Sequence, residues 1–395
     1  MVLTAPKPGE GLKTIEISRE SFPGMFDVFV DLAQTKFDFL DVEKDLTDVE
    51  RGELESKGVL LPKENRPQLP LYECTLADVA GITGDIGPEK PVVNDSFRFE
   101  PFDLSKYASW ARTKHISPAK PTAWIRSAIT DIDLPYWLEQ DEAEVLSQFV
   151  AGEPLKQDLD EKFLRKLIEA EILIRPGAFR QKCERLSGAI RTAKREFDST
   201  KYTVIKNLLP PSHMRAMSRY YRQYVDHGFM VMGDPQVKRR YQQYNEPLAA
   251  FLQPQFKKLI SELASEEVIL SYVYAASYEE GAELQPHIDR EQCEFSISFQ
   301  VDYMPEPPDL ISPWPLFVEP ARLDGKLPKN GIIFGWDYIK NRENGEKTGI
   351  HLANGDGLIY RGRELVHYRY ALPPGHRSTS LFFHFVRTSF NGGLE

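Results

Sequence analysis

From Glu267 onward the sequence is a series of short extended segments separated by Pro and Gly clusters, and this pattern constrains the fold more than any other feature. Between Phe295 and Val301 apolar and polar residues alternate, as on a strand with one buried face. No helical pattern of useful length interrupts the series, so the C-terminal half is predicted to be an all-β sandwich or barrel. Further strands are predicted at residues 268–270, 272–274, 357–360, 366–372 and 380–386.

The part of the chain before these strands has a helical pattern. Residues 178–265 are mostly helical in character, with amphipathic stretches at 214–225 and 248–263. Pro247 suits the first turn of the second stretch, whereas Pro254 is predicted to kink or split it. The chain is therefore predicted to be α+β, with helices supporting a C-terminal β-domain.

A helix, a turn, a second helix and a short strand are predicted in that order before residue 178. The first helical face runs over residues 145–150, a Gly-Glu-Pro break follows at 152–154, and the second helix and the strand cover 163–168 and 172–174. This order resembles the winged-helix, PqqD-like modules that bind leader peptides. The alternative is a plain helical pair packed against the C-terminal domain, because such helix pairs are common and carry no chemistry by themselves.

The domain organisation follows from these patterns and from chain length. At 395 residues the chain exceeds the size at which a single hydrophobic core stops growing. We expect three units: an N-terminal region of uncertain fold (1–120), the helical or winged-helix-like module (121–178) and the C-terminal domain (179–395).

Composition excludes several classes of function. A net charge of −10 argues against general nucleic-acid binding, which needs concentrated Lys and Arg, and the basic clusters at 191–195 and 238–240 are predicted to be solvated helix faces. No apolar run is long enough to span a bilayer, so no membrane partner is expected. The N-terminus lacks the layout of a secretory signal and only three cysteines are present, which predicts a cytoplasmic protein.

Two histidines and one aspartate carry the predicted chemistry. His287 and Asp289 are two residues apart in an extended segment, so their side chains project to the same face. With His367 from a later strand they would form a facial set of two imidazoles and one carboxylate. Such a set binds iron(II) and leaves positions free for a bidentate oxoacid and for dioxygen.

The motif His-x-Asp alone is a weak signal for a metal site, but here further residues of the predicted site follow it in order along the chain. A predicted strand at 357–360 precedes His367, and Arg377 follows ten residues later within another predicted strand. From about residue 202 to the C-terminus this series resembles the 2-oxoglutarate/Fe(II) dioxygenase superfamily. The resemblance implies a double-stranded β-helix (jelly-roll) in which His287, Asp289 and His367 bind Fe(II), with O2 as a cosubstrate.

The same resemblance implies that Arg377 binds the distal carboxylate of 2-oxoglutarate. A guanidinium suits this role because it grips a carboxylate through two parallel hydrogen bonds and stays charged. Thr379 lies on the same strand face and is a candidate second cofactor-binding residue. Arg377 in a surface ion pair and Thr379 in a purely structural role are the alternatives.

Residues 278–286 directly precede the first predicted ligand, His287, and resemble the same segment in the prolyl hydroxylase branch. Leu284, however, stands where that branch often has a second Tyr. This resemblance favours hydroxylation of a peptide or amino-acid-like substrate over other small molecules. Halogenases of the superfamily lack the carboxylate ligand, whereas Asp289 is present, so hydroxylation or desaturation is favoured over halogenation. A cupin-type metalloenzyme (an isomerase or a 2-oxoglutarate-independent oxygenase) and a non-catalytic binding protein on the same fold are the alternatives.

Three other histidines compete with His367 as ligands. His351 lacks a basic residue at the right distance downstream, and His376 belongs to a turn beside Pro374-Gly375. His384 lies out of phase with Leu381 and Phe383 on a predicted strand and is interpreted as a structural histidine.

Overall fold

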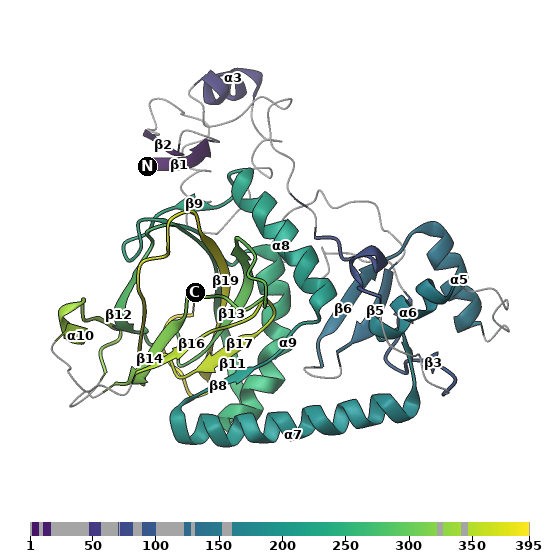
Figure 1. Cartoon of the computed structure of the whole chain (residues 1–395). Helices are drawn as coiled ribbons and strands as arrows, with labels where there is room; N and C mark the ends of the chain where they lie inside the picture. The colour runs from purple at the N-terminus through teal and green to yellow at the C-terminus, as the bar shows by residue number, and fades with distance from the viewer. Residues whose placement is uncertain are drawn as a thin grey trace.

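The computed structural model describes residues 2–7, 11–16, 47–56, 70, 72–81, 89–99, 122–127, 131–151, 160–321, 327–340 and 347–394. Two antiparallel sheets face each other in the C-terminal half, and three long helices lie beside them (Figure 1). A smaller β-sheet with two helices lies on the other side of these long helices (Figure 1).

The larger sheet of the C-terminal half has seven strands in the order β8-β17-β13-β19-β11-β10-β9. All neighbouring strands of this sheet pair in the antiparallel direction. The strands are β8 (Tyr202–Ile205), β9 (Val231–Met232), β10 (Arg240–Tyr244), β11 (Val268–Glu279), β13 (Phe295–Met304), β17 (Gly357–Tyr360) and β19 (Arg377–Arg387).

The smaller sheet has five strands in the order β15-β12-β18-β14-β16. Along the chain β11, β12, β13 and β14 alternate between the two sheets, and so do β16, β17, β18 and β19, which is the connectivity of a double-stranded β-helix. The predicted jelly-roll is therefore confirmed. The strands are β12 (Leu284–Ile288), β14 (Leu316–Pro320), β15 (Ile332–Ile333), β16 (Thr348–Ile350) and β18 (Leu365–Arg369).

Helices cover the outer face of the larger sheet. They are α7 (Pro176–Thr200), α8 (Pro211–Asp226) and α9 (Pro247–Ala264), and α9 packs on β11 and β19 while α8 packs on β13. The apolar residues of β13 face these helices, and its alternating polar residues, such as Ser296 and Gln300, are buried as well. The polar face of this strand therefore lines the interior between the two sheets, and both faces of the strand are buried.

Helix α9 contains both of the prolines that the sequence singled out, and of the two effects predicted for Pro254 the structure excludes the split. Pro247 occupies the first turn, where its missing N–H has no helical partner to lose, and Glu246 caps this end. Pro254 lies inside the helix without splitting it. The buried side chains on both sides of it, including Phe251 and Phe256, hold the helix against the sheet and offset the lost hydrogen bond.

The N-terminal half contributes small sheets and two helices. β4 (Arg98–Phe99), β5 (Thr122–Arg126) and β6 (Asp133–Trp137) form one sheet, and β3 (Val92–Val93) pairs with β7 (Leu173–Ile174). The predicted helix, helix and strand are confirmed as α5 (Gln140–Val150), α6 (Glu161–Glu169) and β7, whereas their identity as a winged helix stays a prediction. The remaining elements are β1 (Val2–Lys7), β2 (Gly11–Glu16), α3 (Asp48–Ser56), the 3-10 turn η2 (Leu76–Asp78) and α10 (Asp337–Lys340).

The predicted boundary between residues 178 and 179 falls in the first turn of α7. One continuous hydrophobic core joins residues from both sides of this boundary, such as Trp124 and Leu173 on one side and Phe256 and Phe383 on the other. Among the residues that the structure describes, no helix is long and apolar enough to cross a membrane.

Candidate metal centre

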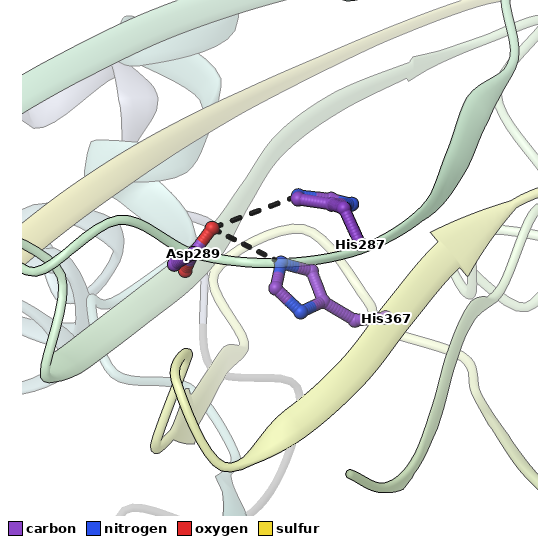
Figure 2. A group of neighbouring side chains, drawn as sticks. All are labelled: His287, Asp289 and His367. Carbon is purple, nitrogen blue, oxygen red and sulfur yellow. Dashed lines mark ion pairs between the residues drawn. The ribbon is translucent and has the colours of Figure 1, made fainter. Parts of the chain in front are cut away.

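Two neighbouring strands of the smaller sheet bring the predicted ligands together. His287 lies in β12 and His367 in β18, and the register of this pair places them directly opposite each other. Their ring centroids are 4.1 Å apart. Asp289 comes just after the end of β12 and turns its carboxylate toward both rings (Figure 2).

The three side chains offer donor atoms at distances suited to sharing one cation. Asp289 Oδ1 lies 3.6 Å from His287 Nε2 and 3.4 Å from His367 Nε2 (Figure 2). All three donor atoms lie within 4.8 Å of one another. His287 and His367 are buried, so water competes poorly for the space between them.

The strands also set which nitrogen of each ring is free. His287 Nδ1 lies 2.9 Å from the carbonyl oxygen of Gln285, and His367 Nδ1 lies 3.1 Å from that of Leu365. A carbonyl oxygen only accepts, so each neutral ring donates its Nδ1–H and keeps a lone pair on Nε2. Backbone contacts of this kind orient the histidine ligands of metal sites.

The electrostatics of the cluster favour a bound cation. Burial alone would raise the pKa of Asp289, but the imidazoles of His367 and His287 hold it well below its usual range. Burial lowers the pKa of His287. Burial opposes the charged form of His367 too, yet Asp289 outweighs it and raises the pKa of this imidazole. A carboxylate and two Nε2 lone pairs directed at one point repel one another unless a proton or a metal ion lies between them.

The cluster opens into a cavity of about 380 Å³ between the two sheets. This volume is in the range of small-molecule sites, roughly 300–1,000 Å³. The cavity is rich in aromatic and basic side chains although the protein is acidic overall. Besides the three candidate ligands, its polar lining includes Asp234, Arg240, Tyr272, Tyr274, Tyr278, Arg290, Cys293, Tyr360, Arg369 and His384.

The structure places Arg377 and Thr379 outside the lining of this cavity. On β19, His384 and Phe382 line the cavity, so the residues of odd number point to the other face, where Phe383 packs on Phe256 of α9. Arg377 is on that other face, with its Nε 2.8 Å from Glu279 Oε1. Thr379 Oγ1 lies 3.0 Å from Ser277 Oγ. Neither residue lines the cavity, so neither is placed to hold a molecule bound at the metal centre.

Arg369 and Arg240 are cavity residues that sequence reasoning missed. Arg369 is two positions after His367 on β18, so the same spacing rule that paired His287 with Asp289 could have found it. Arg240 belongs to the cluster predicted to be a solvated helix face. It lies instead on β10, is buried, and forms an ion pair with Asp234.

Tyrosines from two strands of the larger sheet line the same cavity as Leu284. Leu284 is buried and lines the cavity, while Tyr272, Tyr274 and Tyr278 enter it from β11 and Tyr360 from β17.

A second group of possible donors shares Asp289. Its carboxylate, Cys293 Sγ and His384 also lie within 4.8 Å of one another. Burial raises the pKa of the Cys293 thiol, which disfavours the thiolate that a metal needs, and the thiol contacts Tyr272 Oη at 3.2 Å. His384 Nδ1 contacts Ser296 Oγ at 2.9 Å, and burial lowers the pKa of this imidazole to about 4.

His351 and His376 have partners outside the cavity. His351 Nδ1 lies 2.9 Å from the carbonyl oxygen of Ser312, and His376 Nδ1 lies 2.8 Å from Tyr303 Oη. Within the described part of the chain, His367 is the histidine that joins His287 and Asp289.

No protein-family model matches the sequence, and no curated protein matches it. Solved structures to which the chain is similar include the non-heme alpha ketoglutarate dependent epimerase SnoN from nogalamycin biosynthesis, with 14% identity, a TM-score of 0.41, and coverage of 51% of this chain and 84% of that chain. A Pseudomonas putida prolyl-4-hydroxylase is 13% identical, with a TM-score of 0.37 over 51% of this chain and 100% of that chain. HygX from Streptomyces hygroscopicus, with nickel, 2-oxoglutarate and hygromycin B bound, is 12% identical, with a TM-score of 0.38 over 51% of this chain and 88% of that chain.

Proposed function

We propose that this chain is an Fe(II)- and 2-oxoglutarate-dependent dioxygenase whose metal is held by His287, Asp289 and His367. The observation that carries the proposal is the convergence of two imidazole Nε2 atoms and one carboxylate oxygen in the lining of a cavity. Two nitrogen donors and one hard anion on one side of an ion leave its other positions open, which is the arrangement of non-haem iron(II) oxygenases.

The metal would supply the activation of dioxygen, which protein side chains cannot perform alone. The residues of the chain bind and orient. The Nδ1 contacts to Gln285 and Leu365 keep both imidazoles aimed at one point, and the low pKa of Asp289 keeps its carboxylate charged at neutral pH. The aromatic walls exclude water from the reacting atoms.

The basic lining of the cavity supports an anionic cosubstrate. Arg240, Arg290 and Arg369 all reach it, whereas Asp234 and Asp289 are the acidic residues of the described lining. A dicarboxylic oxoacid would complement this excess of positive charge, with Arg240, Arg290 and Arg369 available to its carboxylates.

The proposed reaction hydroxylates an unactivated C–H bond of a peptide or amino-acid-like substrate. One oxygen atom of O2 enters the C–H bond to give the alcohol. The other oxygen atom enters succinate as 2-oxoglutarate loses CO2. The feature that favours this substrate class is the segment before His287, residues 278–286, which resembles the same segment of prolyl hydroxylases.

Anaerobic metal loading tests the proposal. Purified protein loaded with Fe(II) is expected to develop a weak visible absorption band when 2-oxoglutarate is added, and to release succinate when O2 is admitted. His367→Ala should weaken Fe(II) binding by more than about 100-fold, since even residues behind the ligands contribute 10- to 100-fold. His351→Ala removes an imidazole outside the cavity and should leave both signals unchanged.

The alternative is a cupin-type metalloenzyme, either an isomerase or an oxygenase that does not use 2-oxoglutarate. Catalytic zinc sites also use two histidines and a carboxylate, so ligand identity alone does not separate the two classes. A wild-type protein that binds metal at this centre, but shows no band and no succinate, would favour this alternative.

A further inference from the structure

Arg369 is a buried guanidinium beside the candidate metal centre. It lies two residues after His367 on β18, so both side chains project to the same face of the smaller sheet, and both line the cavity. Only 2% of its surface is exposed, and it is among the largest fully buried side chains of the protein. In the pairing of β12 with β18, Arg369 lies opposite Leu284, and His367 lies opposite His287.

No acidic residue of the described chain forms an ion pair with this guanidinium. Its Nη1 donates to the carbonyl oxygen of Trp314 over 3.3 Å, and the group lies 4.4 Å from the centre of the Trp314 ring. Its Nε is buried and has no hydrogen-bond partner among the described residues. The groups that favour its charge are the phenols of Tyr278, Tyr360 and Tyr303 rather than a carboxylate.

An unpaired buried charge is costly, because the protein replaces water around the ion without supplying an opposite charge. Arg369 nevertheless stays a cation, because arginine is so basic. Arg240, in the same cavity, shows the paired arrangement: its guanidinium is bound by Asp234 and lies over the rings of Tyr274 and Tyr278.

We propose that Arg369 binds a carboxylate of the small anion that occupies the cavity. This inference rests on the proposed function, in which that anion is 2-oxoglutarate. The group held by Arg369 is then the carboxylate remote from the metal. Arg377, on the outer face of the larger sheet, has no part in it.

The geometry of β18 fits a short dicarboxylate. Successive residues on one face of a strand are about 7 Å apart, since each residue advances the chain by roughly 3.3 Å. His367 and Arg369 therefore present a metal-binding nitrogen and a cation along one wall of the cavity. An acid with an oxoacid group at one end and a carboxylate at the other can contact both.

A comparison of two oxoacids tests the role of Arg369. Binding of 2-oxoglutarate and of 2-oxopentanoate, which lacks the second carboxylate, is measured calorimetrically on anaerobic Fe(II)-loaded protein. Wild type is expected to prefer 2-oxoglutarate by about 30-fold or more, the usual effect of a buried charge pair. Arg369→Met should lose this preference while it still binds 2-oxopentanoate and Fe(II). Arg377→Met, the matched control, should keep the preference.

Thermal unfolding of the ligand-free proteins gives a second readout. Arg369→Met removes an unpaired buried charge and replaces it with an apolar side chain of similar length, so its Tm is expected to equal or exceed that of wild type. An Arg369→Met protein that is less stable and still prefers 2-oxoglutarate would assign Arg369 a structural role.

The outcomes separate the two proposals. If wild type binds 2-oxoglutarate through the metal and Arg369→Met keeps the preference, the assignment of Arg369 is overturned and the dioxygenase proposal stands. If Arg377→Met is the variant that loses the preference, Arg377 and not Arg369 binds the second carboxylate. If metal-loaded wild type binds neither acid, the dioxygenase proposal fails, and the assignment of Arg369 fails with it.

Discussion

The position of Asp289 depends on the absence of a side chain at residue 362. The backbone N–H of Asp289 donates to the carbonyl oxygen of Gly362 over 2.9 Å, so the turn before β18 lies against the carboxylate. A Cβ at position 362 would overlap Asp289 Oδ2 and lie 3.0 Å from the carbonyl oxygen of Cys293. This glycine therefore permits the close approach that aims Asp289 at the two imidazoles.

Gly362→Ala should displace the Asp289 carboxylate and weaken Fe(II) binding by about 10-fold or more, because residues behind metal ligands commonly contribute 10- to 100-fold. Overpacking should also lower the free energy of unfolding by about 1–3 kcal/mol. Metal titration and chemical denaturation measure the two effects. Gly393→Ala adds a Cβ with nothing within 4 Å and serves as the control. Unchanged metal affinity in Gly362→Ala would show that the contact with Asp289 is dispensable.

At the scale of elements, strand periodicity predicted the strands and the pairing of His287 with Asp289, but not which face of β19 (Arg377–Arg387) lines the cavity. His287 and Asp289 could be paired from their spacing, and β17 begins and ends as the sequence predicts. Arg377 and His384 are an odd number of residues apart on β19, so an unbroken strand places them on opposite faces. Both faces of this strand are buried, and polar residues occur on each: Thr379 lies on one face, and Ser380 and His384 lie on the other.

The packing of α8 against the N-terminal half brings together residues that are remote in sequence. His213, in the first turn of α8, has its Nδ1 2.6 Å from Tyr72 Oη, and its ring lies 4.7 Å from that of Tyr136. The imidazole is fully buried, and burial lowers its pKa to about 3. Arg219 of the same helix forms an ion pair with Asp78.

His213 is expected to make the folded protein sensitive to acid. The unfolded chain protonates this residue below about pH 6.5 while the folded chain does not until about pH 3, so stability is full above pH 6.5 and falls as the pH drops toward 3. Between pH 7 and pH 5 the loss attributable to His213 is about 2 kcal/mol.

Chemical denaturation at both pH values measures this loss. His213→Asn keeps an acceptor near the Tyr72 hydroxyl and removes the titrating ring, so its unfolding free energy should depend less on pH by about that amount. His227→Asn, at the exposed C-terminal end of α8, is the control. An unaltered pH dependence in His213→Asn would contradict the buried neutral imidazole.

At the scale of the whole molecule, the sequence predicted the architecture of the C-terminal half but not how the N-terminal half joins it. Local periodicity identifies strands and helices, whereas the contacts of Tyr72 with His213 and of Asp78 with Arg219 connect segments far apart in the chain. The hydrophobic core that runs from Trp124 to the helices of the β-domain is continuous. The division into three units (1–120, 121–178 and 179–395) stays a prediction.

The location of bound iron tests the central claim most directly. Crystals grown anaerobically with Fe(II) would be measured on both sides of the iron absorption edge to place the metal by anomalous scattering. The predicted result is a peak at bonding distance from His287 Nε2, His367 Nε2 and the Asp289 carboxylate. A peak on Cys293 and His384 instead, or folded protein that shows no peak between the two imidazoles, would contradict the account.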